Sequence, residues 1–198
     1  MFQLLTLALA AAALAGATPA TAQAVTYAYT PFDLAKCEQT TRADDEGFDA
    51  WECKGYGGIA INVVADDERM YISYGPKAKD ELASEETLAS YNSEGKTIEW
   101  RLTPGPDGKP RAFAAIMRWN VTRWTDDKPI IGAVLVVTRL GPGGVCHVGY
   151  VDGRANPNAN DLAREIADNR ARRFRCKQDK PVVRGLKGPT FSGPMVRE

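Results

Sequence analysis

The sequence predicts an α+β, β-rich fold, in which about seven or eight mostly antiparallel strands form a curved sheet or an open barrel and one helix lies near the C-terminus. Short apolar runs alternate with turns rich in Gly, Pro and Asp, a pattern typical of successive β-hairpins. Only residues 158–175 repeat apolar side chains at helical spacing. The runs 130–137 and 145–151 flank a Gly-Pro-Gly-Gly loop, and because the first run does not alternate, we expect a central strand covered on both faces.

Residues 1–22 have the pattern of a signal peptide. The apolar run 4–17 is shorter than the ~20 residues of a membrane-spanning helix, and Ala20-Thr21-Ala22 has the small residues of a signal-peptidase site. Cleavage after Ala22 predicts a periplasmic or secreted protein with no transmembrane segment in the mature chain. The alternative is an uncleaved membrane anchor, because residues 1–3 contain no Lys or Arg.

The mature chain is predicted to form one domain over residues 23–186, followed by a disordered tail at 187–198, where Pro, Gly and Lys recur. All 25 basic and all 25 acidic residues lie in this mature chain, so its formal net charge is zero. A neutral chain argues against a nucleic-acid-binding protein, because such proteins attract phosphates with an excess of Lys and Arg.

An even number of cysteines in a chain predicted to be exported indicates disulfides. The cysteines are Cys37, Cys53, Cys146 and Cys176. Three pairings are open to four cysteines, and we favour Cys37–Cys53 and Cys146–Cys176, which join neighbours along the chain. A zinc site is the weaker alternative, because there is no Cys-x-x-Cys motif and only one histidine. No metal and no cofactor is predicted.

A short helix and three strands are predicted in the first part of the domain. Thr30-Pro31 has the composition of a helix start, and a helix there would end near Cys37. The strands, separated by turn residues, are 51–53, 59–64 and 69–74. The glycines of residues 55–58 suggest a phosphate-binding loop, but such a loop needs a helix after it, and the β-branched residues that follow predict a strand. A tight turn therefore explains these glycines better.

Residues 77–94 are polar, with few large apolar side chains. We interpret them as a surface loop with a helical turn near 84–90, and as the segment best suited to move as a lid or contact loop. Strands are then predicted at 96–102 and 111–124, joined by the turn 104–108.

The predicted C-terminal helix has one apolar face. That face consists of Ala163, Ala167, Ala171 and Phe174. Asn158 and Asp161 are expected to cap the start of the helix. Ion pairs are expected from Asp168 to Arg164 and to Arg172, each four residues away. A disulfide at Cys176 would pin the end of the helix to the central strand.

His147, the only histidine, would need a nearby carboxylate and a nucleophile to act as a general base. It follows Cys146 in a strand, where neighbouring side chains point to opposite faces, so we expect no Cys–His dyad. A structural histidine is favoured over a catalytic one. The acidic groups 44–46, 66–68 and 126–127 fall at predicted turns and lack the spacing of a calcium-binding loop.

Aromatic and basic residues interleave on the two predicted strands 96–102 and 111–124. The candidate binding residues are Trp100, Arg101, Arg118, Trp119, Arg123 and Trp124. Such a surface could bind a sugar, an anionic envelope polymer or a protein through stacking and cation–π contacts. The alternative is that the tryptophans belong to the core and the arginines to the edge of the sheet.

Three features of the chain occur together. A Cys-x-Gly-x-Gly-Gly run at Cys53–Gly58 leads into a strand, Cys146-His147 lies in another strand, and an Asn-Pro-Asn helix ends near Cys176. In these features the chain resembles a group of small exported bacterial proteins with no assigned function. The resemblance covers most of the mature chain and implies export and the same disulfide stapling. It implies no catalytic residues.

The expected function is that of a periplasmic, non-enzymatic binding or inhibitor module whose partner is an envelope protein or polysaccharide. The sequence offers no recognisable nucleophile–base set or metal set. The alternatives are a hydrolase of envelope polymers that uses Asp or Glu residues, and a structural envelope protein without a ligand. A hydrolase would bring two carboxylates together in a pocket, whereas a binding module would expose aromatic residues.

Overall fold

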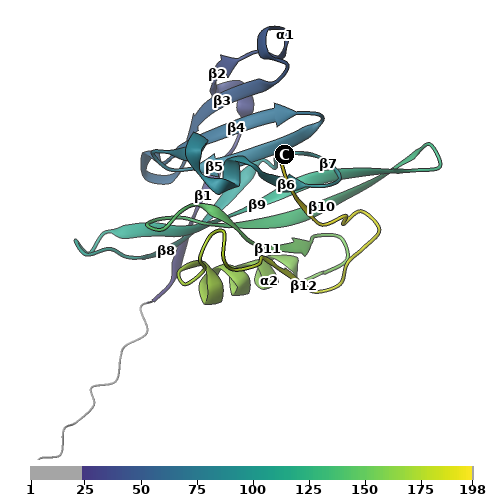
Figure 1. Ribbon diagram of the computed structural model, residues 1–198. Helices are drawn as coiled ribbons and strands as arrows, with labels where there is room; N and C mark the ends of the chain where they lie inside the picture. Colours follow the sequence, from purple (N-terminus) through teal and green to yellow (C-terminus); the bar gives the residue numbers. More distant parts are fainter. Residues whose placement is uncertain (1–23, 198) are drawn as a thin grey trace, which may run out of the picture.

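The computed structural model describes residues 24–197, which form three layers (Figure 1). A four-stranded sheet packs on one face of a seven-stranded sheet, and helix α2 (Ala159–Ile166) covers the other face. This confirms the predicted β-rich α+β class, with open sheets. Within residues 24–197, no helix has the length and apolar composition of a membrane span. The predicted signal peptide, residues 1–22, lies outside the described residues.

The larger sheet has the strand order β1-β8-β9-β10-β11-β12, and β7 pairs beside β9. Its strands are β1 (Thr26–Pro31), β7 (Tyr91–Ser93), β8 (Thr97–Pro104), β9 (Pro110–Thr125), β10 (Lys128–Arg139), β11 (Cys146–Asp152) and β12 (Val182–Arg184). Among the described strands, only β11 and β12 pair in parallel. From Val134 on, β10 is a central strand covered on both faces, as predicted, because Val134 and Val136 pack toward the smaller sheet while Leu135 and Val137 pack toward α2. The prediction is wrong for the start of the run, where Ile131 is 54% exposed.

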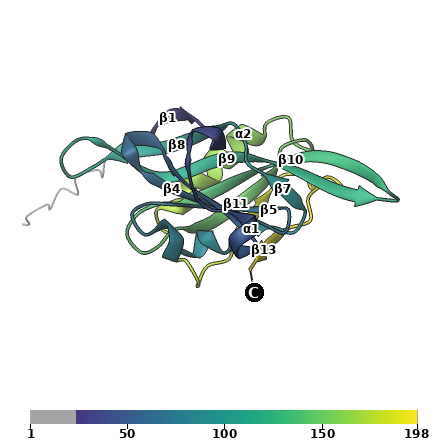
Figure 2. The same ribbon diagram turned by 90° about the horizontal axis from the view of Figure 1, so that it is seen from above.

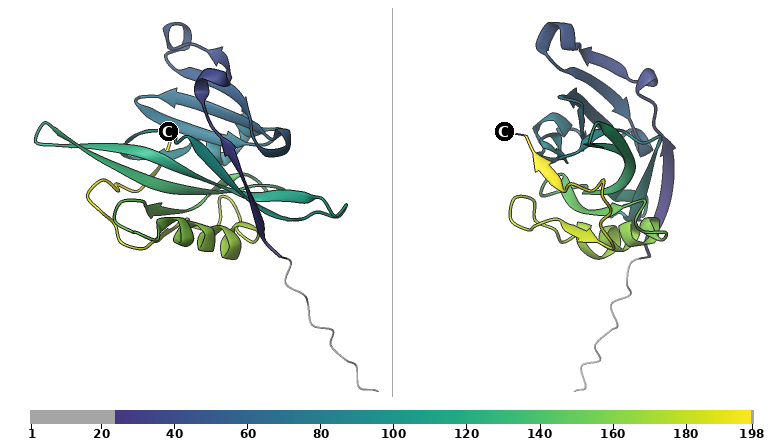
Figure 3. Two further views of the ribbon diagram at one scale, coloured as in Figure 1. Left: turned by 180° about the vertical axis from the view of Figure 1, so that it is seen from behind. Right: turned by 90° about the vertical axis from the view of Figure 1, so that its right-hand side faces the viewer.

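The smaller sheet is antiparallel throughout, in the order β2-β3-β4-β5. Its strands are β2 (Glu38–Thr41), β3 (Asp49–Lys54), β4 (Ala60–Asp66) and β5 (Arg69–Tyr74). A two-stranded sheet pairs β6 (Glu86–Leu88) with β13 (Pro194–Val196). The short helical turns are α1 (Ala43–Glu46), η1 (Leu34–Lys36), η2 (Tyr56–Gly58), η3 (Ala78–Asp80) and η4 (Leu82–Ser84). The views from behind and from the side in Figure 3 show the two main sheets as separate layers.

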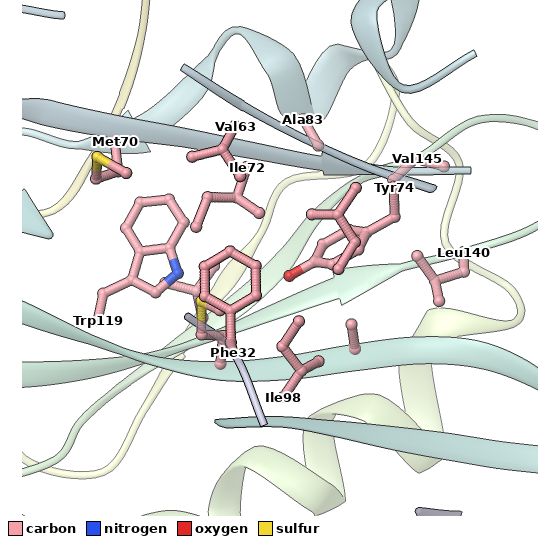
Figure 4. Packing of buried hydrophobic residues seen from close by; sticks show 14 of the residues in the cluster. Phe32, Val63, Met70, Ile72, Tyr74, Ala83, Ile98, Trp119, Leu140 and Val145 are labelled. Carbon is pink, nitrogen blue, oxygen red and sulfur yellow. The ribbon is translucent and has the colours of Figure 1, made fainter. Parts of the chain in front are cut away.

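The main hydrophobic core lies between these two sheets (Figure 4). Val63 and Ile72 enter it from the smaller sheet, and Ile98 enters it from the larger one.

Close packing in this core fixes the glycine turn at 55–58. A Cβ atom on Gly55 would lie 2.4 Å from Cζ2 of Trp100, so only glycine fits at this position.

The second core lies between the larger sheet and the C-terminal helix. The predicted apolar face of the helix, Ala163, Ala167, Ala171 and Phe174, is buried there. The helix continues beyond α2 as a π-helical stretch at Ala167–Ala171. The predicted ion pairs within the helix are wrong, because Arg164 pairs with Glu99 and Asp161 while Asp168 pairs with Arg101. Asn158 makes no side-chain capping bond.

The predicted helix start at Thr30-Pro31 is wrong. β1 continues through Pro31, which lies opposite Thr97 of β8. The turn η1 follows and is capped by Asp33, whose Oδ1 accepts the N–H of Ala35 at 3.1 Å. Pro31 is tolerated because β1 is an edge strand, where one backbone N–H is not needed for pairing.

The segment 77–94 is a packed part of the domain and not the predicted surface loop. Ala83, Thr87 and Leu88 are buried, and the segment contains β6 and β7. The side chain of Asn92 accepts the N–H of Met70 at 3.0 Å, and Thr87 Oγ1 donates to the Met70 carbonyl at 2.7 Å. These bonds cover the outer edge of β5 at Met70. A lid role for this segment is therefore not retained.

The C-terminal segment also departs from the prediction of a disordered tail at 187–198. Thr190 is buried, Phe191 packs against the main core, and Pro194–Val196 forms β13. The segment has few apolar residues, but backbone pairing with β6 supplies hydrogen bonds that composition does not reveal.

Both favoured disulfides are present. Cys37–Cys53 joins the start of β2 to β3, and Cys146–Cys176 joins β11 to the chain after the C-terminal helix. No cysteine in the described part of the chain is free. The first disulfide therefore fastens the start of the smaller sheet, and the second fastens the end of the C-terminal helix to the larger sheet.

Replacing Cys146 and Cys176 together with alanine is expected to lower the free energy of unfolding by about 3 kcal/mol. The disulfide closes a sequence separation of 30 residues, and removing it gives the unfolded chain more freedom. Guanidinium denaturation of the oxidised wild type and the double variant measures the difference. An unchanged midpoint would contradict this prediction.

Candidate functional site

The six predicted binding residues do not share one surface. They form three sequence-adjacent pairs, and neighbouring side chains of a strand point to opposite faces. Trp100 and Trp119 are 0% and 1% exposed and belong to the main core. Trp100 Nε1 donates to Thr30 Oγ1 at 2.9 Å. The alternative interpretation, core tryptophans, therefore describes these two residues.

Arg101 and Arg118 lie on the opposite face, toward the C-terminal helix. Arg101 is buried and donates to both carboxylate oxygens of Asp168, at 2.9 and 2.6 Å, and to Glu99 Oε1 at 3.1 Å. Arg118 Nη2 donates to Asn160 Oδ1 at 3.0 Å. Both arginines thus connect the larger sheet to the helix.

Arg123 and Trp124 lie on a hairpin formed by the ends of β9 and β10, which projects beyond the other strands (Figures 1 and 2). We call residues 120–132 the arm. Trp124 is 55% exposed. Arg123 is also exposed and donates from Nη1 to the Pro189 carbonyl at 3.1 Å. Of the predicted site, only this pair presents an aromatic and a basic side chain together at the surface.

Two adjoining open pockets lie beside the arm. The first, of about 580 Å³, extends from the arm to α1 and to the turn between β4 and β5. The second, of about 660 Å³, extends from the arm to Ser192 near the C-terminus. The residues that line both pockets are Arg69, Tyr91, Thr122 and Trp124. We therefore treat the two pockets as one site, the arm groove.

The arm groove has exposed aromatic surface beside a fixed cation. Tyr91 is 38% exposed, and its ring centroid lies 5.2 Å from the guanidinium carbon of Arg69. Arg69 forms an ion pair with Asp67, and its Nε and Nη2 donate to the Ala89 carbonyl at 3.4 and 3.2 Å. Because Arg69 is held from two sides, the aromatic ring stacked beside it is held in place as well.

Of the four carboxylates that line the arm groove, three are engaged in contacts within the described part of the protein and only Glu68 is not. Asp66 pairs with Arg197, Asp67 pairs with Arg69, and Asp49 accepts hydrogen bonds from Gln39 and from the backbone of residue 43. A glycoside hydrolase instead needs two carboxyl groups that face a substrate. The groove is better suited to stacking and hydrogen bonding than to carboxylate chemistry.

A second cluster of polar side chains is buried between β6 and β11. Glu86 accepts the backbone N–H of His147 at 2.6 Å, and His147 Nδ1 lies 2.9 Å from the hydroxyl of Tyr150. Burial raises the pKa of Glu86 to about 7 and lowers the pKa of His147 to about 3. His147 is completely buried, so a substrate has no access to its ring. The histidine is structural, in agreement with the favoured interpretation.

Sequence reasoning missed Glu86, Arg69 and Tyr91. Glu86 and Tyr91 come from the polar segment interpreted as a surface loop, where nothing distinguishes a buried acid from a solvated one.

Within residues 24–197, no group of three or more His, Cys, Asp or Glu side chains is placed to hold a metal ion. Comparisons with family models, with curated proteins and with solved structures found no match to this chain.

Proposed function

We propose that this protein is a non-enzymatic binding module and that its ligand lies in the arm groove. The observation that carries the proposal is the exposed Trp124, which lines the groove together with Tyr91 and Arg69. Trp, Tyr and Arg are the residues most enriched where binding energy concentrates. A large aromatic side chain left in water beside fixed polar groups is a surface ready for a partner.

The module would act in the periplasm or outside the cell, once the signal peptide, residues 1–22, has been removed by cleavage after Ala22. Two disulfides support an oxidising compartment. The resemblance to small exported bacterial proteins supports the same location. The ligand would then be an envelope protein or polysaccharide, since an indole ring offers a large apolar face together with a polar N–H.

The mature, oxidised protein is immobilised and is expected to retain a component of the envelope. The Trp124→Ala variant should retain that component at least about tenfold less, because removing a central Trp typically weakens binding by about 2 kcal/mol or more. Envelope extract is passed over both proteins. Retained proteins are identified by mass spectrometry and retained polysaccharides by sugar analysis.

Tyr27→Ala is the matched control. Tyr27 lies on β1, is 62% exposed and does not line either pocket of the arm groove. Its removal is expected to leave retention unchanged. A component retained equally by wild type and Trp124→Ala would contradict the proposed site, and one lost equally from both variants would indicate unspecific adhesion to aromatic surface.

A further inference from the structure

The C-terminal strand is held to the domain by β6. In the β6–β13 pair, Glu86 lies opposite Val196. Two backbone hydrogen bonds flank this pairing. Ala89 N–H donates to the Gly193 carbonyl at 3.0 Å, and Arg197 N–H donates to the carbonyl of residue 85 at 2.7 Å. Release of β6 would therefore release the C-terminal strand.

The β6–β13 pair is continuous with one wall of the arm groove. Ala89, Ser90 and Ser192 line the groove. Ser90 Oγ donates to the Thr190 carbonyl at 2.9 Å and is hydrogen-bonded to Ser192. The position of this wall thus depends on the pairing of β6 with β13.

Glu86 is a buried carboxylate without a cation. It is 7% exposed, and within the described chain no ion pair involves it. Its hydrogen-bond partner is the backbone N–H of His147. The titratable or charged residues on or beside the elements packed around it are His147 and Tyr150 on β11, Arg69, Tyr71 and Tyr74 on β5, Glu81 before η4, Glu85 before β6 and Arg197 after β13. Of the arginines, Arg69 is paired with Asp67 and Arg197 with Asp66.

We propose that Glu86 is a pH-sensitive latch for the arm groove: in its protonated form it stays buried and holds the β6–β13 wall, and on ionisation it moves toward water and loosens that wall. This regulation rests on the proposed binding function of the groove. A lone backbone N–H is too little to compensate a buried negative charge, whereas it suffices for a neutral carboxyl group.

The direction of the pH dependence follows from the two states of the latch. Burial raises the pKa of Glu86 to about 7 in the closed state, against 4.5 for the exposed group in the opened state. Between these values the closed state keeps a proton that the opened state releases. Opening therefore becomes more favourable as the pH rises from 4.5 to 7. Above pH 7 the free energy of opening changes little, because Glu86 is ionised in both states.

Native-state hydrogen exchange of the full mature protein tests the latch. The reporter amides are those of Ala89 and Arg197, which flank the β6–β13 pair. The ratio of wild-type to Glu86→Gln exchange rates at these amides is expected to rise by on the order of 10²-fold between pH 5 and pH 8. Glutamine keeps an acceptor for the His147 N–H but cannot ionise. Parallel exchange of the two proteins across this range would overturn the latch.

An internal control keeps the test decisive if the variant folds poorly. The amide of Leu140 donates to the Phe113 carbonyl at 2.8 Å, at the far end of β10. In the wild type alone, exchange at Ala89 and Arg197, relative to Leu140, should accelerate toward pH 8. Melting temperature is a poorer measure, because His147, whose pKa is lowered to about 3, destabilises the fold as the pH falls below 6.5.

Ligand retention at pH 5 and pH 8 tests the regulation itself. The component whose retention depends on Trp124 is expected to be held more weakly at pH 8 by the wild type and equally at both values by Glu86→Gln. Equal retention by the wild type at both values overturns the regulation. Failure to retain any component would count against the binding function, while the exchange measurement, which needs no ligand, still decides the latch.

Discussion

Arg101→Ala is expected to destabilise the domain by about 3–5 kcal/mol, although it removes no apolar core residue. The Arg101 guanidinium is buried between Glu99 and Asp168, and Glu99 also binds Arg164. The hydrogen bond to Asp168 is the main cause of the raised pKa of Arg101. Loss of this cation leaves the carboxylates of Glu99 and Asp168 with too few hydrogen-bond donors inside the protein. Guanidinium denaturation at neutral pH measures the change in the free energy of unfolding.

Arg111→Ala is the matched control for that experiment. Arg111 pairs with Asp107 at 3.5 Å, and both side chains are largely exposed. A surface pair of this kind contributes less than about 1 kcal/mol. Similar losses for the two variants would show that the Glu99–Arg101–Asp168 network does not fasten the C-terminal helix to the sheet.

Trp100→Ala is expected to cost about 3–5 kcal/mol, whereas Trp124→Ala is expected to change stability by less than about 1 kcal/mol. Trp100 is fully buried, packs edge-on against Tyr74 with ring centroids 5.6 Å apart, and donates a hydrogen bond to Thr30. Its removal leaves a cavity between the two sheets. Trp124 fills no such space. Denaturation curves of both variants, recorded under the same conditions, provide the comparison.

Comparable losses for these two tryptophan variants would contradict the division into a core residue and a binding residue. They would give Trp124 a structural role and weaken the argument for the arm groove. A stable Trp124→Ala protein, by contrast, makes any loss of retention attributable to the missing indole.

Local patterns predicted much of the fold. The hairpins β4–β5 and β10–β11 and the apolar helix face were predictable because alternation, turn residues and helical spacing act over a few neighbouring residues. The pairing of β6 with β13 was not predictable in this way. These strands are short, far apart in the sequence and joined through backbone groups, which every residue carries.

The candidate site was predicted only in part. Strand alternation separates Trp100 from Arg101 and Arg118 from Trp119, so each pair is divided between the two faces of a covered sheet. Only Arg123 and Trp124 lie where the hairpin leaves the sheet and both faces reach solvent. Arg69 and Tyr91 come from other segments, and only tertiary packing brings them to the groove.

The side chains that cover β5 have a consequence for solubility. An uncovered strand edge offers unpaired N–H and C=O groups on which another chain can add a strand, the first step of edge-to-edge aggregation. Here Asn92 occupies the N–H of Met70 and Thr87 occupies its carbonyl. Asn92 and Thr87 thus spend these hydrogen bonds on the protein itself, and a second molecule finds no free backbone group at Met70 on which to start a strand.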